Sequence, residues 1–88
     1  MRIEWDTVKA ETNLEKHGVS FQEAAEIVSG IHVEFKADVR GEKRTKAIGR
    51  IMGVYITVIY TQREQAVRII SARLATQRER SCYDKYLD

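Results

Sequence analysis

Three β-type runs follow one another closely in the second half of the chain, and this spacing limits the possible folds more than any other feature. They cover residues 44–50, 54–60 and 67–73, and the middle run is rich in β-branched and aromatic side chains. Connections this short favour antiparallel pairing between neighbouring strands. A fourth run, residues 31–36, alternates strictly between apolar and polar side chains. The sequence therefore predicts a four-stranded antiparallel meander.

The first residues predict a short edge strand followed by a helix. Residues 2–5 alternate, and Asp6 is a suitable N-cap for a helix over residues 7–16. In that helix we expect Val8 and Leu14 to face the core.

Two capping boxes mark two further helices. Ser20 and Glu23 open a helix that ends near Gly30, and Thr76 and Glu79 open a C-terminal helix. In the first of these, apolar side chains recur at helical spacing, at Phe21, Ala24, Ala25 and Val28. The predicted order is β-α-α-β-β-β-β-α. This is an α+β fold, with two N-terminal helices packed on one face of a small antiparallel sheet and a C-terminal helix.

Length and composition indicate one soluble domain. The 88 residues fit a single domain, residues 1–88, and their 32% of charged side chains are mixed in sign. No long apolar run or signal-peptide pattern is present, so we expect a cytoplasmic protein without membrane contact. The single Cys82 excludes an internal disulfide and fits a reducing compartment.

Positive charge gathers in the second half of the chain. The net charge is only +2, yet after residue 44 there are eight Lys and Arg against four Asp and Glu. This imbalance is compatible with a surface that faces nucleic acid, and equally with a solvated surface of mixed charge.

Several kinds of site are not predicted. The sequence has no Gly-rich phosphate loop, no paired Cys and His at metal-binding spacing and no nucleophile elbow. We therefore expect no metal and no cofactor.

A polar sheet face remains as the candidate site. If residues 31–36 and 44–50 pair as a hairpin, the polar side chains of both strands would share a surface on the side away from the helices: His32, Glu34, Lys36, Arg44 and Lys46. RNA cleavage without a metal needs a base for the 2′-OH, cations for the phosphate and an acid for the leaving oxygen. The alternative is that these side chains form only the wet face of a half-exposed sheet.

Two arginines bracket the last strand. Arg68 and Arg73 are five residues apart, so a regular strand would point them to opposite faces, whereas a bulge would remove this restriction. Each could contact phosphate or form a structural ion pair, with Glu79 or with an N-terminal acid. Arg80 stands in the first helical turn, where the helix dipole disfavours a cation, and this hints at an anionic neighbour.

The sequence resembles the BrnT toxin family along almost its whole length. The N-terminal part of the pattern comprises Glu4-Trp5-Asp6, Lys9, Asn13, residues 16–21 and Ala24. The middle part comprises Arg44, Ala47-Ile48-Gly49, Tyr60-Thr61 and Arg63. The C-terminal part comprises residues 68–73, Ala75-Thr76, Glu79-Arg80 and Tyr83.

The resemblance implies a RelE-like ribonuclease toxin of a type II toxin–antitoxin system. Such a toxin would cleave RNA without a metal and arrest translation. Its implied partner is a BrnA-type ribbon-helix-helix antitoxin in a heterotetramer, so operator DNA would be bound only through the antitoxin. The alternative is a toxin-fold binding module that has lost activity and serves as antitoxin partner and co-repressor.

The resemblance implies that the candidate residues bind RNA or take part in its cleavage. Arg44 and Lys46 would bind phosphate and stabilise the transition state, and Arg68 and Arg73 would add further phosphate contacts. The base would be His32 or Glu34, or else His17 or Lys9 if the first helix borders the site. The remaining RNA-binding candidates are Lys9, Arg63, Arg80 and Tyr83.

Overall fold

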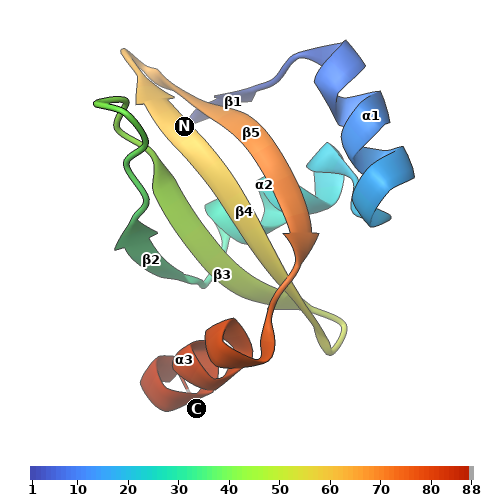
Figure 1. The fold of residues 1–88 in the computed structure, drawn as a ribbon, viewed down its shortest axis with the longest axis vertical. Helices are drawn as coiled ribbons and strands as arrows, with labels where there is room; N and C mark the ends of the chain where they lie inside the picture. Colours follow the sequence, from blue (N-terminus) through green and yellow to red (C-terminus); the bar gives the residue numbers. More distant parts are fainter. Residues whose placement is uncertain (88) are drawn as a thin grey trace.

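The computed structural model describes residues 1–87 and contains the eight predicted elements in the predicted order (Figure 1). The helices and strands are β1 (Arg2–Glu4), α1 (Thr7–His17), α2 (Phe21–Ser29), β2 (Val33–Lys36), β3 (Thr45–Ile51), β4 (Val54–Arg63), β5 (Ala66–Leu74) and α3 (Gln77–Leu87). No helix among these residues is long and apolar enough to cross a membrane.

The five strands form one sheet in the order β1-β5-β4-β3-β2. β2 to β5 make the predicted antiparallel meander, with two-residue turns between β3 and β4 and between β4 and β5. β1 lies at the edge, as predicted, but it pairs parallel with β5. The sheet is therefore mixed: the predicted antiparallel pairing holds for β2 to β5, and the edge strand β1 differs from it. α1 and α2 carry the chain from β1 at one edge of the sheet to β2 at the other.

The core lies between α2 and one face of the sheet. Ser20 caps α2 and forms the predicted capping box with Glu23. Phe21 and Ile27 are almost fully buried, and a Cβ on Gly49 of β3 would lie 2.7 Å from Ile27 Cδ1. The small residue at position 49 thus lets α2 approach the sheet closely. In Figure 1, α2 runs behind β4.

α1 packs along the edge of β5 and buries a polar residue instead of the predicted apolar ones. Val8 and Leu14 are 70% and 51% exposed, so the expectation that they face the core is wrong. Asn13 is buried, and its side chain bonds Ala72 N–H at 3.2 Å, Ala72 C=O at 2.8 Å and Val19 C=O at 3.0 Å. An amide side chain therefore completes the backbone pairing of β5 where β1 has ended.

β2 is shorter than predicted. It begins at Val33, and Ile31 is 76% exposed, because α2 continues to Ser29 and a bend follows before the chain can join the sheet.

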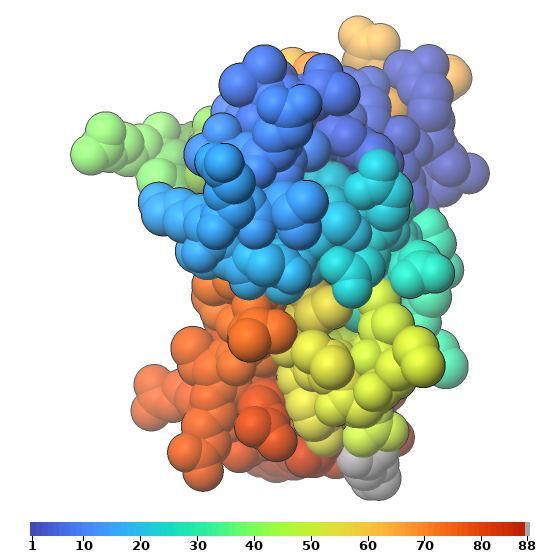
Figure 2. Space-filling model, turned by 90° about the vertical axis from the view of Figure 1, so that its right-hand side faces the viewer, coloured from blue at the N-terminus to red at the C-terminus, as the bar shows by residue number. Residues whose placement is uncertain are grey.

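α3 contacts β3 and β2, and Figure 1 shows it at the opposite end of the molecule from α1. Figure 2, seen from the side, shows α1 and α2 over one half of the molecule and the β3–β4 turn with the start of α3 at the other. α3 contacts the sheet on the face opposite the core.

Candidate functional site

A β-bulge brings Arg68 and Arg73 to the same face of the sheet. Arg68 pairs with Thr61 and Arg73 with Thr57, two residues of β4 that are four positions apart and therefore point the same way. The extra residue is Ile70, because the partners of Ile59 and Tyr60 on β5 are Ser71 and Ile69. Opposite orientation of the two arginines, the expectation for a regular strand, does not hold.

Lys46 lies on this same face. It pairs with Ile59 of β4, which lies between Thr57 and Thr61 and points to the same side of that strand. We call this side the α3 face and define it by Lys46, Thr57, Arg68 and Arg73. The opposite, core face carries the residues that pack against α1 and α2, such as Ala47, Val58 and Ala72.

Glu79 of α3 lies at the centre of the polar contacts on the α3 face. Its carboxylate accepts two hydrogen bonds from Arg73, Nη1 at 2.7 Å and Nη2 at 2.9 Å, and contacts Lys46 Nζ at 3.1 Å. Thr57 Oγ1 and the backbone N–H of Thr76 donate to Oε1, both at 2.9 Å. The capping box predicted for α3 is therefore present and also holds two of the candidate cations.

The contacts of Glu79 keep it ionised. Burial alone would raise the pKa of Glu79, but the hydrogen bonds from Arg73, the Thr76 backbone, Thr57 and Lys46 outweigh it, and the pKa lies well below its usual value. The same pairing raises the pKa of Arg73, mainly through the hydrogen bond to Glu79. Two cations share one carboxylate, so the cluster retains a positive charge.

Arg68 has a separate carboxylate partner. Its Nε lies 3.2 Å from Glu4 Oε2 on β1, and both side chains are 34% exposed. The parallel pairing of β1 with β5, which aligns Glu4 with Arg68, produces this ion pair.

Arg44 also faces a carboxylate, on the loop that joins β2 to β3. Its Nη2 donates to Glu42 Oε2 at 3.3 Å. Glu42 bridges Val39 in a small hairpin whose tip, Arg40 and Gly41, has positive φ at both residues. This hairpin fixes the backbone of Glu42 close to the start of β3.

Glu42 feels the charge of three candidate cations, of which Arg44 is in contact with it. The hydrogen bond from Arg44, and then the charges of Arg44, Arg63 and Lys9, lower the pKa of this exposed carboxylate. Lys9 and His17 also line a shallow hollow beside Ser71 of β5. Ser71 pairs with Ile59, so α1 borders the α3 face.

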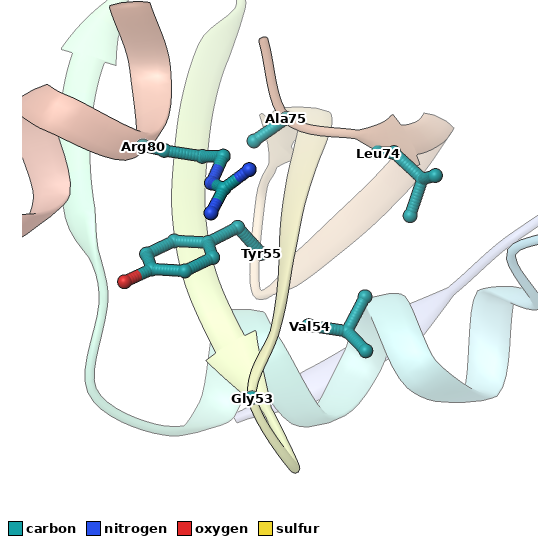
Figure 3. A pocket seen from close by; sticks show the side chains of 6 residues that line it. All are labelled: Gly53, Val54, Tyr55, Leu74, Ala75 and Arg80. Carbon is teal, nitrogen blue, oxygen red and sulfur yellow. The ribbon is translucent and has the colours of Figure 1, made fainter. Parts of the chain in front are cut away.

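An aromatic and cationic cluster lies where β4 meets α3. Arg80 lies over the Tyr55 ring, 4.8 Å from its centroid, beside a shallow hollow at the end of the sheet (Figure 3). Tyr83 is buried and meets Tyr55 edge to face, with 5.6 Å between ring centroids. Little of the Tyr83 ring is left to stack on a base, whereas the exposed Arg80 remains open to an anion.

His32 and Glu34 lie on the wrong face for the predicted cluster. Glu34 pairs with Ala47 of the core face, whereas Lys46 pairs with Phe35. The hairpin between β2 and β3 exists, but its register is one residue different from the one that would place Glu34 beside Lys46. The predicted surface shared by His32 and Glu34 with Lys46 is therefore wrong.

The Glu34 carboxylate already has two hydrogen-bond partners. It accepts hydrogen bonds from His32 Nε2 at 2.8 Å and from Tyr60 Oη at 2.9 Å, and these contacts lower its pKa. Burial first, and then Glu34, raise the pKa of Tyr60 to about 12. A carboxylate held in this way is a poor general base.

No group of three or more His, Cys, Asp and Glu side chains in residues 1–87 is arranged to hold a metal ion.

Fold and charge together define an α+β protein with a cationic sheet face. A family model described as ribonuclease toxin, BrnT, of type II toxin–antitoxin system matches residues 5–79. The chain belongs to this family of ribonuclease toxins, and an antitoxin is its implied class of partner. The search of curated proteins found no match.

Sequence reasoning placed Glu79 only as a helix cap and as one possible partner of an arginine. The capping box was the available signal, but the spacing of Lys46, Arg73 and Glu79 along the chain does not show that they meet. An N-terminal acid was one of the partners expected for the arginines of the last strand, and the structure identifies it as Glu4, bound to Arg68. Glu42 gave no signal as the partner of Arg44.

Proposed function

We propose that this toxin is an endoribonuclease that cleaves RNA on its α3 face without a metal and thereby inhibits translation in the cytoplasm. The observation that carries the proposal is the pair of cations, Lys46 and Arg73, held side by side on Glu79 while 30% and 36% of their side chains stay exposed. Arg68 adds a third cation to the same face.

The proposed reaction transfers the phosphorus from the 5′ oxygen to the 2′ oxygen. A base removes the 2′-OH proton, the 2′ oxygen bonds to phosphorus, and the bond to the 5′ oxygen breaks as that oxygen takes a proton. The products are a 2′,3′-cyclic phosphate and a 5′-hydroxyl. Lys46 and Arg73 would stabilise the negative charge that develops on the phosphate oxygens.

Arg68 and Arg44 would hold the flanking phosphates, because Arg68 lies on the α3 face, Arg44 stands two residues before Lys46, and both side chains remain partly exposed. Lys9, Arg63 and Arg80 would extend this contact to neighbouring nucleotides. His17 and Lys9, which border the α3 face from α1, are the remaining candidates for the base.

The partner we propose is a BrnA-type ribbon-helix-helix antitoxin in a heterotetramer. In that complex, operator DNA would be bound by the antitoxin alone. Family membership supports this partner.

One observation favours a second function, that of an inactive co-repressor. Arg44, Arg68 and Arg73 each already have a carboxylate partner in the chain itself. If RNA cannot displace or share these carboxylates, the fold would serve antitoxin binding alone.

Cleavage of a synthetic RNA in excess EDTA decides between the two functions. The purified toxin should cut the RNA and leave a 2′,3′-cyclic phosphate, whereas a matched strand with 2′-deoxyribose should stay intact. Cleavage that stops in EDTA would contradict the metal-free mechanism. A folded protein that cuts no RNA and permits normal growth without antitoxin would support the co-repressor.

A further inference from the structure

We propose that Glu79 is a positioning residue for RNA cleavage, because its buried carboxylate holds Lys46 and Arg73 as one pair with their exposed sides toward the substrate. This inference rests on the proposed ribonuclease function and assigns Glu79 a task within that site.

The exposure of the three side chains supports a directed arrangement. Glu79 has 7% of its side chain exposed, against 30% for Lys46 and 36% for Arg73. The carboxylate therefore lies beneath the two cations, and solvent or RNA meets the cations first. A phosphate on the α3 face could contact both without displacing Glu79.

The charge balance does not suit a purely structural pair. A buried ion pair adds little stability over apolar side chains of similar size, because desolvation offsets the attraction. Here two cations meet one carboxylate, so one positive charge is left over on the α3 face. That excess is a cost to the folded protein but an advantage at a site where phosphate charge develops.

The carboxylate is itself held in place from two sides. Thr57 comes from the central strand β4 and the Thr76 N–H from the start of α3, and both donate to Oε1. With Arg73 on both oxygens and Lys46 on Oε2, the carboxylate has little freedom to rotate. Lys46 and Arg73 are therefore ordered before RNA arrives, which favours the reaction because misplacement of such groups is costly.

A matched pair of variants separates positioning from helix capping. Glu79→Gln removes the charge but keeps the size of the side chain. Glu23→Gln makes the same change at the same place in the capping box of α2, where the Glu23 carboxylate, among residues 1–87, bonds only the backbone and hydroxyl of Ser20. Both variants lose a capping carboxylate, but only the first loses a partner of Lys46 and Arg73.

Steady-state cleavage of one RNA in EDTA, with the thermal midpoint of each variant, supplies the readout. We expect Glu79→Gln to lower kcat by about 10-fold or more while KM changes by less than about threefold. Glu23→Gln should keep the wild-type kcat. Equal kcat values for folded Glu79→Gln, Glu23→Gln and wild type would overturn the inference.

Thr57→Val keeps the test decisive if Glu79→Gln does not fold. Valine has the shape of threonine, so this variant removes one hydrogen bond to Glu79 and leaves every charge in place. A lower kcat with KM near that of wild type supports positioning, and an unchanged kcat overturns it. A wild-type protein that cleaves no RNA would instead contradict the proposed function itself.

Discussion

Asn13 shows how one polar side chain can complete a sheet. β1 pairs with β5 only as far as Arg68, and beyond it the N–H and C=O of Ala72 face α1. The Asn13 amide supplies both a donor and an acceptor, and a further bond to Val19 fixes the loop after α1. An apolar side chain there would leave buried backbone groups unpaired.

We expect Asn13→Ala to lower the free energy of unfolding by about 2–4 kcal/mol, because it leaves three backbone groups without partners. Leu14→Ala on the same helix should cost only about 0.5 kcal/mol, because Leu14 is half-exposed. Urea unfolding of the two variants checks this contrast. The reverse order would contradict the packing of α1 on β5.

Gly49 of β3 leaves room for the side chain of Ile27 from α2. A methyl group at this position would lie 2.7 and 2.9 Å from the side chain of Ile27, so Gly49→Ala should cost about 1–3 kcal/mol. In an Ile27→Ala background the same change should cost much less, because the clashing atoms are gone. Additive losses in the double variant would show that α2 does not approach β3 in this way.

At the scale of elements, the order of helices and strands follows from local signals. The capping boxes at Ser20 and Thr76 and the short turns between strands each act within a few residues, so they can be recognised in the sequence. These signals say nothing of which face of the sheet α3 covers. Nor do they reveal the parallel pairing of β1, which depends on contacts between distant segments.

The bulge at Ile70 decides the faces of Arg68 and Arg73. One extra residue reverses the direction of every side chain that follows it, so the two arginines share a face, which is the alternative to a regular strand that the sequence left open. The register between β2 and β3 places Glu34 with Ala47 and not with Lys46, against the prediction. Composition identified the cations, but only the strand register decides which of them share a face.

The attachment of α3 to the sheet should depend on pH through Glu79. Its pKa is lowered in the folded protein, so the stability it contributes is complete above its ordinary value of 4.5 and is lost as the pH falls below that value. Wild type should therefore lose stability between about pH 5 and pH 3 more steeply than Glu79→Gln, which is less stable at neutral pH. Urea midpoints across this range provide the measurement, and parallel curves for the two proteins would contradict it.

At the scale of the whole molecule, the two faces of the sheet differ in the side chains they carry. α1 and α2 cover the core face, and the buried apolar side chains there come from α2 and, in larger number, from β3, β4 and β5. The α3 face keeps cations that are paired with carboxylates yet partly open to solvent. Under the proposed function, the core face stabilises the fold and the α3 face binds and cleaves RNA.

The comparison of the two faces tests this account most directly. The rate of RNA cleavage in EDTA would be measured for folded Lys46→Ala, Arg68→Ala and Arg73→Ala, and for His32→Ala and Lys36→Ala. Lys36 and Glu34 of β2 point to the core face, and His32, just before β2, bonds Glu34. We predict that the first three lower kcat/KM by about 10-fold or more and that the last two stay within about twofold of wild type. Loss of cleavage in the His32 or Lys36 variants, with wild-type rates in the other three, would contradict it.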